Sequence, residues 1–418
     1  MATASESDVA MATGTRPGIG RRSALTRGAG AWIAVLLAIP LGLAVLLFTH
    51  YGQGVSGIDL GVYRGGAGTL LDGKPLYEFV YGPGLPFTYP PIAAVLFVPL
   101  AWLPGALALG TWTFLSVLAL EVVVWLTLRH LDVTDPVLRL RWTAIFAVIG
   151  LSLDATLFNT WIGQINIFLM LLIFLDLLAP TGRFRGVAIG IAAGLKLTPL
   201  IFIGYLLFTR RFHAAATATA AFAATVLIGF AVTPKDAASY WKKYVFDVKR
   251  ITLDGQAPFL DSSINRLLAR LHSPHPSVVY LVLAVVVGVQ GLTVAVWASR
   301  RGYELTGVMA CGITGLLVSP VSWTFHWVWF VPLLVMLTVR ASRGNRTGEK
   351  IGVALMWLVC LTSAWWVVKQ IRDDPIPAPI NHFYANWLTF AGIGALIGFA
   401  LHLRRTAELP ARVPEPLP

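Results

Sequence analysis

The chain has 418 residues, of which 56% are hydrophobic and only 12% are charged. A soluble domain usually carries about 25% charged residues, so this composition excludes a soluble enzyme, and the apolar content also excludes a disordered chain. Lys and Arg number 32 against 20 Asp and Glu. On a membrane protein this excess indicates basic cytoplasmic loops beside anionic lipid, and no nucleic-acid partner is expected.

The first predicted membrane helix covers residues 31–49, a run without charge and close to the roughly 20 residues that cross a bilayer. Arginines 16, 21, 22 and 27 precede it and place the N-terminus in the cytoplasm. A cleaved signal peptide is the alternative, but the run is long and no small-x-small site follows, which favours an uncleaved helix. Residues 1–28 are predicted to be a flexible cytoplasmic tail.

Further apolar runs lie near 90–103, 106–127, 142–158, 164–179, 184–208, 213–233, 276–299, 305–320, 322–339, 351–369 and 387–403. With the first they predict an all-α, polytopic integral membrane protein of about 12 transmembrane helices over residues 29–405. An even number of crossings returns the C-terminus to the cytoplasm, where residues 406–418 form a second tail. Cys311 and Cys360 lie inside apolar runs and form neither a disulfide framework nor a metal motif.

Two basic loops, 128–141 and 180–187, conflict with a strict count of crossings, which puts them outside although their arginines favour the inside. In a second topology, 90–103 is a partial dip and 184–208 is a hairpin of two half-helices broken at 196–199, because broken helices are tolerated where they line a cavity. Both topologies remain open. Both leave 50–88, 234–275, the turn 319–326 and the segment 370–386 on the external side.

The two large external loops, 50–88 and 234–275, are too short to bury cores of their own. Both are rich in aromatic residues and in short amphipathic pieces such as 240–244 and 264–268. We expect these pieces to lie on the membrane face and to form the wall of a cavity.

Ionisable groups at membrane depth are costly and therefore mark candidate sites. Asp59 follows the first helix and has apolar neighbours on both sides. It is either a general base at the rim of the bilayer or the N-cap of the following helix. His326 lies in the external turn 319–326, where it either acts in proton transfer or belongs to an interfacial aromatic belt.

Lys196 lies deep in an apolar stretch, where a cation suits a phosphate or carboxylate partner. Gln164 and Asn166 open a span with two amides, which either cap the helix or bind a sugar. Glu121, Asp154 and Asp176 lie in or near spans and are candidate counter-charges between helices. The sequence contains no P-loop, dinucleotide fingerprint, HExxH motif or Asp-x-Asp metal clamp.

Five short blocks, in order along residues 30–405, resemble those of family eighty-seven of the glycosyltransferases. The first combines Asp59 and Tyr63 with Leu-Asp-Gly-Lys-Pro-Leu-Tyr at 71–77. The others are Phe-Thr-Tyr-Pro-Pro at 87–91, which contains Tyr89, Gly-Gln-Ile-Asn at 163–166, Gly-Leu-Lys-Leu-Thr-Pro at 194–199, and Ser-Pro-Val-Ser-Trp-Thr-Phe-His at 319–326. The segment 261–266 departs from the family pattern, so no role is transferred to it.

The resemblance implies an integral membrane mannosyltransferase of the C superfamily, with its site facing outward from the plasma membrane. It implies a polyprenyl-phosphate-mannose donor and a mannosylated glycolipid acceptor, both held in the membrane, and contact with membrane lipid. Actinobacterial members of this family add α-1,2-linked mannose to phosphatidylinositol mannosides, or to lipomannan and lipoarabinomannan. By the same resemblance, Tyr63 and Tyr89 are candidate substrate-binding residues.

The residues fit such chemistry. A donor with a β-linked mannose and an α product require inversion, which a single base accomplishes by taking the acceptor proton, and Asp59 is the candidate. His326, Lys196 and Arg64 are candidates to stabilise the leaving phosphate, so neither a metal nor a cofactor is required. A secondary transporter or flippase with Lys196 as its substrate site, and a non-catalytic scaffold, remain alternatives. The absence of a visible repeat and the two sizeable external loops favour the enzyme.

Overall fold

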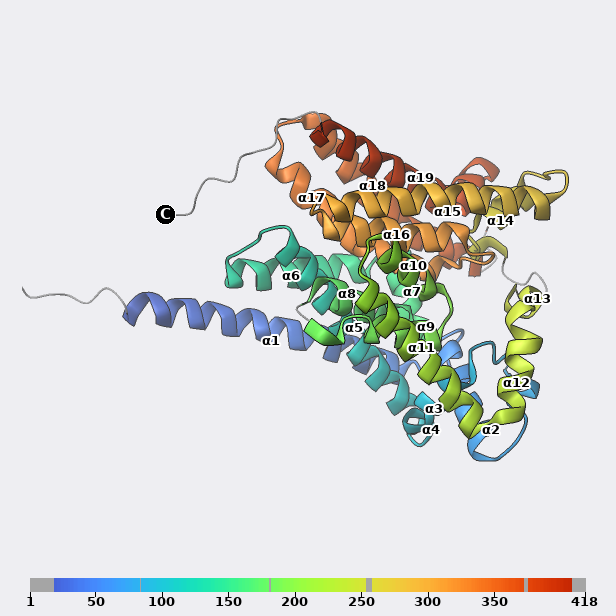
Figure 1. Cartoon of the computed structure of the whole chain (residues 1–418). Coiled ribbons are helices and arrows are strands. Elements are labelled where there is room, and N and C mark those ends of the chain that lie inside the picture. The colour runs from blue at the N-terminus through green and yellow to red at the C-terminus, as the bar shows by residue number, and fades with distance from the viewer. Residues whose placement is uncertain (1–18, 83, 180–181, 253–257, 372–374, 408–418) are drawn as a thin grey trace, which may run out of the picture.

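The computed structural model describes residues 19–82, 84–179, 182–252, 258–371 and 375–407, and these residues are almost entirely helical (Figure 1). The sheet among them is a two-stranded antiparallel hairpin of β1 (Val80–Tyr81) and β2 (Leu85–Pro86). The predicted all-α membrane class is confirmed. Most of the predicted 1–28 and 406–418 tails lies outside the described residues, but α1 (Ile19–Thr49) already begins within the first of them.

Six helices in the described residues are long and apolar enough to cross a membrane. They are α1, α5 (Gly105–His130), α11 (Phe212–Val232), α15 (Pro276–Arg300), η7 with α17 (Thr324–Trp329 and Phe330–Arg343) and α19 (Ala378–Ala407). A bent pair adds a seventh, α6 (Pro136–Leu151) and α7 (Asp154–Ile162), which meet at 78°.

The expected count of about 12 spans is not confirmed, because several apolar segments are short or interrupted. The shorter helices are α8 (Asn166–Leu178), α9 (Val187–Leu195), α10 (Ile201–Phe208) and α16 (Glu304–Val318). The long helix α18 (Thr347–Ile371) packs beside α17. The run near 90–103 forms two small helices, α3 (Pro91–Leu96) and α4 (Val98–Ala101). Prolines within and beside them lack the N–H groups that a continuous helix needs.

The run 184–208 is broken at Lys196, as the second topology predicts. The helix α9 ends at Leu195, Lys196 is extended, and η3 (Thr198–Leu200) with Pro199 begins the next piece. Glycines allow α9 to lie directly on α11: a Cβ at Gly190 would lie 2.3 Å from the Ala218 carbonyl oxygen. This contact places the backbone break, and Lys196 with it, at a fixed point of the bundle.

The arginine-bearing turns gather at one end of the bundle. Arg343 donates to the Leu131 carbonyl, which joins the end of α17 to the 128–141 loop. The backbone at Gly186, which follows η2 (Gly182–Phe184), lies against Ala214 near the start of α11. The two loops that a strict count places outside therefore lie at the same end as the other basic turns, which removes the conflict with the charge rule.

The two loops predicted to be external lie at the opposite end. The first contains α2 (Ile58–Leu71), η1 (Leu76–Glu78) and the hairpin. The second contains α12 (Pro234–Lys242), η4 (Tyr244–Phe246), α13 (Val248–Thr252), η6 (Pro258–Leu260) and α14 (Ile264–Arg270). In Figure 1 the helices α12 and α13 run across the direction of the long helices. Two hydrophobic cores, one in the helical bundle and one beneath α2 and α3, meet at this end.

Candidate functional site

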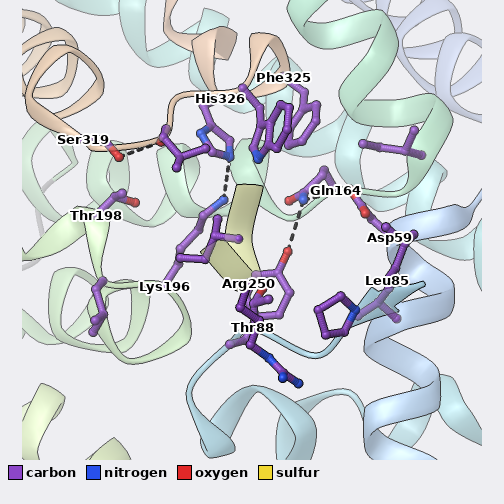
Figure 2. Close-up of a pocket in the computed structure, with 18 of the residues that line it drawn as sticks. Asp59, Leu85, Thr88, Gln164, Lys196, Thr198, Arg250, Ser319, Phe325 and His326 are labelled. Atoms are coloured by element: carbon purple, nitrogen blue, oxygen red, sulfur yellow. Dashed lines mark hydrogen bonds between the residues drawn. The ribbon is translucent and has the colours of Figure 1, made fainter. Parts of the chain in front are cut away.

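A cavity of about 420 Å³ lies at the end of the bundle that carries the loops 50–88 and 234–275. Its wall comes from α2, the β2–α3 connection, the α7–α8 connection, the break at Lys196, the α12–α13 segment and the 319–326 turn. Five residues singled out from the sequence line it: Asp59, Tyr89, Gln164, Lys196 and His326. Figure 2 shows Lys196 and His326 on one side of this space and Asp59 on the other.

Asp59 lies in the first turn of α2, but it does not cap the helix. The N-cap position is Gly57, with a φ of 71° and no side-chain capping bond. Instead, the Asp59 Oδ2 accepts a hydrogen bond of 2.9 Å from the Gln164 amide. The capping interpretation is therefore wrong, and the carboxylate faces a cavity instead of its own backbone.

Gln164 is the hydrogen-bonding centre of this side of the cavity. Its Oε1 accepts from the Tyr63 hydroxyl at 2.8 Å and from the Ile165 backbone at 3.1 Å. Its Nε2 donates to Asp59 and, at 3.2 Å, to the Tyr89 hydroxyl. Because both ends of the amide are engaged, Gln164 orients the carboxylate and is not left to bind a sugar by itself.

Burial sets the electrostatics around Asp59. It raises the pKa of Asp59 to about 6, against the Gln164 hydrogen bond and the charge of Lys196, which both lower it. Burial also raises the pKa of Tyr63 well above its usual range, and it raises the pKa of Tyr89. The two tyrosines therefore remain neutral donors, while Asp59 loses its proton close to neutral pH. A carboxylate with this pKa suits proton abstraction near neutrality.

Lys196 forms the second polar group of the cavity. Its ammonium donates to the Asn166 Oδ1 and lies 3.0 Å from the His326 Nε2. If the lysine donates to this nitrogen, the imidazole is neutral and carries its proton on Nδ1. Asn166 in turn donates to the Phe325 carbonyl at 3.0 Å, which ties the lysine to the turn that carries His326.

The candidate counter-charges do not reach Lys196. Asp154 accepts from the Ala155 backbone, and Asp176 accepts from the backbone N–H groups of Gly186 and Ile189. Among the ion pairs of the described residues, neither aspartate is paired with Lys196. The lysine presents its charge to the cavity, where an anionic ligand can meet it.

Arg64 is not brought to the cavity. Its guanidinium donates to the carbonyls of Leu100 and Leu103, and to the Tyr51 hydroxyl at 3.4 Å. These carbonyls lie at the end of α4, where the helix stops before Pro104 and leaves them without helical partners. The Arg64 side chain therefore supplies the hydrogen bonds that these carbonyls lack. The sequence placed Arg64 close to Asp59 but could not show which way its side chain points.

Arg250 lines the cavity instead and was not singled out from the sequence. It donates to the Tyr77 carbonyl at 2.6 Å, and its guanidinium lies 4.9 Å from the centre of the Tyr244 ring. Tyr240 and Tyr244 of the same segment also line the cavity. The aromatic, amphipathic pattern predicted that this segment walls a cavity, but no motif distinguished Arg250 within it.

A second contact missed from the sequence holds the His326 turn in place. The buried Asp261 accepts two backbone bonds of 3.0 Å through its Oδ1, one from Ser263 and one from Ser322. The Ser262 backbone donates to the Ser322 carbonyl at 2.8 Å, and Asp261 pairs with Trp323 in an isolated β-bridge. The segment 260–263 thus acts as a brace for the turn 319–326.

In the described part of the chain, no three His, Cys, Asp or Glu side chains gather as metal ligands.

The membrane bundle contains a cavity in which one candidate base faces a lysine–histidine pair. Together with the comparisons, these features define the protein as a membrane-embedded glycosyltransferase. The profile of glycosyltransferase family 87 matches residues 87–320. The chain belongs to glycosyltransferase family 87.

Curated relatives extend the match over most of the chain. It is 33% identical to a polyprenol-phosphate-mannose-dependent α-(1-2)-phosphatidylinositol mannoside mannosyltransferase of Mycobacterium tuberculosis, over 80% of this chain and 86% of the relative. The protein of that name from Mycolicibacterium smegmatis is also 33% identical, over 81% of each chain. A phosphatidylinositol pentamannoside mannosyltransferase of Mycobacterium tuberculosis is 33% identical over 83% of this chain and 81% of its own length. No solved structure matches the chain.

Proposed function

We propose that this enzyme moves mannose from polyprenyl-phosphate-mannose to a phosphatidylinositol mannoside, forming an α-1,2 linkage at the external face of the plasma membrane. The names of the curated relatives support the donor, the acceptor class and the linkage. The observation that carries the proposal is the arrangement in one cavity of a half-buried carboxylate, Asp59, and a Lys196–His326 pair.

The reaction divides between these two groups. The acceptor hydroxyl oxygen forms a bond to the anomeric carbon, the bond from that carbon to the phosphate oxygen breaks, and Asp59 takes the hydroxyl proton. The polyprenyl phosphate leaves with one more negative charge, which the Lys196 ammonium stabilises. Attack opposite to the leaving group inverts the anomeric centre, so a β-linked donor yields an α-linked product.

The polar network supports this assignment, because it positions both groups without placing a bond between them. Gln164 holds Asp59 at 2.9 Å, Asn166 holds Lys196 at 3.0 Å, and the two amides lie 3.4 Å apart. Fixed groups of this kind need no rearrangement when charge develops in the transition state.

The charge distribution supports the proposed location. The arginine-rich turns lie at the end of the bundle opposite the cavity, and basic loops mark the cytoplasmic side. The cavity then opens toward the outside at the level of the lipid headgroups, where a lipid-linked donor presents its sugar. A donor carried by a lipid needs no nucleotide pocket.

The test is transfer by the purified full-length protein in proteoliposomes, with radiolabelled polyprenyl-phosphate-mannose and a phosphatidylinositol mannoside. We expect a longer mannolipid whose new residue is released by an α-1,2-specific mannosidase, and equal rates with and without EDTA. Products formed only on lipomannan would show instead that this enzyme is a lipomannan mannosyltransferase, the other activity expected of the family. Movement of labelled donor across the vesicle without any product would support a flippase and contradict the proposal.

A further inference from the structure

The outer face of the α12–α13 segment concentrates positive charge where the charge rule does not predict it. Four of the eight lysines of the chain lie within residues 235–250: Lys235, Lys242, Lys243 and Lys249. They lie at the cavity end of the bundle, away from the arginine-rich turns. A topology signal would place basic residues at the other end, so this cluster requires another explanation.

The segment has two chemically distinct faces. Ala237 and Tyr240 are buried, and Tyr240 contributes to the cavity wall. Lys235, Ser239 and Lys242 follow at intervals of four and three residues on the opposite, exposed face. Residues at this spacing share one side of a helix, so the lysines point away from the cavity that the other face lines.

The acidic residues near Lys242 and Lys243 are engaged by the backbone. Asp236 accepts from the Leu76 backbone at 3.0 Å, and Asp247 accepts from the Arg250 backbone at 3.2 Å. Within the part of the chain that the structure describes, neither Lys242 nor Lys243 forms an ion pair. Both lysines are exposed, and the Lys243 ammonium lies 5.1 Å from the centre of the Tyr244 ring, a contact that uses none of its hydrogen-bond donors. Both ammonium groups can therefore donate to an external anion.

An apolar residue stands among the lysines. Phe246 is 77% exposed, the largest exposed fraction of any large hydrophobic side chain described. An aromatic ring beside lysines is typical of helices that lie in the plane of a membrane interface. The orientation agrees, because α12 and α13 run across the ends of the spans (Figure 1).

We propose that Lys235, Lys242, Lys243, Lys249 and Phe246 form a docking surface for the phosphodiester headgroups of anionic lipids in the leaflet at the cavity end. Phosphodiesters match the ammonium groups, and the apolar boundary of the leaflet receives Phe246. A lysine close to an anionic membrane strengthens attachment by about 1 kcal/mol, or about fivefold. The surface lies on the reverse side of the cavity wall, so it enriches anionic lipid beside the site, whichever sugar acceptor is used.

Photocapture at Phe246 tests the surface locally. The full-length protein, with a photoreactive benzoylphenylalanine in place of Phe246, is placed in nanodiscs of equal phosphatidylglycerol and phosphatidylcholine. We expect several-fold more phosphatidylglycerol than phosphatidylcholine among the captured lipids. The ratio should fall toward that of the nanodisc with Lys242→Gln and Lys243→Gln combined, and should decline as salt rises. Lys74→Gln removes an exposed lysine of the first external loop and should leave the ratio unchanged.

Two results would overturn the proposal. Capture of protein, or no capture of lipid, at position 246 would show that this face does not meet the bilayer. A lipid ratio equal to that of the nanodisc, or one unaffected by the double substitution, would show that the lysines do not select anionic headgroups. Capture requires no sugar transfer, so neither result depends on the enzymatic assay.

Discussion

Asp59, the proposed base, illustrates how its surroundings set the properties of a single carboxylate. The first turn of α2 holds it at a helix N-terminus, where a negative charge is favoured. Burial opposes the charge and raises the pKa to about 6. Gln164 then fixes the orientation of the group through a bond of 2.9 Å. The result is a carboxylate that is charged near neutral pH and yet retains affinity for a proton, as the proposed base requires.

Substitution Asp59→Asn should lower the transfer rate by about 10²–10⁴-fold, the usual contribution of a positioned general base. The amide keeps the size of the side chain but cannot accept the hydroxyl proton. Steady-state rates of the purified variant measure the loss, and thermal unfolding checks the fold. Asp72→Asn, which alters an exposed aspartate of the same loop, is the matched control and should retain activity. Turnover of Asp59→Asn like that of the wild type would place the base elsewhere, with His326 next in order.

The pH dependence of kcat/KM should show an acidic limb with a midpoint near 6, because the pKa of Asp59 is raised to about 6 and the proposed base acts only in its deprotonated form. Activity is therefore lost as pH falls through this value. Gln164→Leu removes a hydrogen bond that stabilises the charged form, which raises the pKa, so the limb should move to higher pH. A midpoint that does not move in this variant would assign the titration to another group.

Lys196→Met should weaken use of the donor more than use of the acceptor. The ammonium that the cavity offers to the donor phosphate is lost, while the aliphatic stem is retained. Kinetics with each substrate varied in turn separate the two effects through kcat and the two KM values. Unchanged donor kinetics would remove Lys196 from the site. Reduced yield with normal kinetics would show instead that its bonds to Asn166 and His326 serve only the fold.

At the scale of elements, chain breaks bring the site together. The helix ends at Leu195, so that Lys196 enters the cavity from a backbone interruption, and the α7–α8 connection presents Gln164 in the same way. The third piece is the turn 319–326, which has little regular structure of its own. It takes its position from the brace at 260–263 through backbone pairing.

Asp261→Ala should reduce kcat by up to about 10²-fold, because a displacement of about 1 Å in a catalytic group has an effect of this size. The substitution removes the two bonds of 3.0 Å that the Oδ1 accepts from Ser263 and Ser322. Asp261→Asn keeps an oxygen at that position and should restore most of the turnover. The comparison is made by single-turnover rates with saturating donor.

The control for the brace is Ser263→Ala, which removes the N-cap of α14. Its expected effect is about 1 kcal/mol of stability with little change in kcat. If Asp261→Ala and Ser263→Ala lowered turnover equally, and Asn at position 261 gave no rescue, the segment would contribute only to folding.

At the scale of the whole molecule, the distribution of charge and the position of the cavity describe one orientation in the membrane. Arg301 donates a hydrogen bond to the Leu403 carbonyl, and Arg300 donates one to the Phe208 carbonyl, each at the end opposite the cavity. These basic side chains therefore also hydrogen-bond carbonyls near the C-terminal ends of helices, where cations are favoured.

Cysteine labelling in intact cells tests the orientation. Exposed positions near Asp59 and near the His326 turn, changed as Gln53→Cys and Ser277→Cys, should react with a membrane-impermeant maleimide from outside. Ser342→Cys, at the arginine-rich end, should react only after the cells are opened. The native Cys311 and Cys360 are buried and should add little background. Labelling of the first two positions from opposite sides would contradict a shared external cavity.

The sequence by itself determined the class of the molecule, because too few charges remain to cover a soluble surface. It also located Asp59, Lys196 and His326, because ionisable groups at membrane depth are costly and are rarely present without a partner or a role. The helix break at Lys196 was predictable for a similar local reason, since Pro199 cannot continue a helix.

The tertiary structure alone decided which of these groups meet and which way they point. Arg64 turns to backbone carbonyls, Gln164 turns to Asp59, and Arg250 enters the cavity from a loop far along the chain. Such choices depend on contacts between residues far apart in the chain, 36 positions for Arg64 and Leu100 and 105 for Gln164 and Asp59, whereas propensity and periodicity report only on neighbours within a few turns. The number of full spans depended on the same contacts, because a segment buried among other helices can be short or broken without exposing its backbone to lipid.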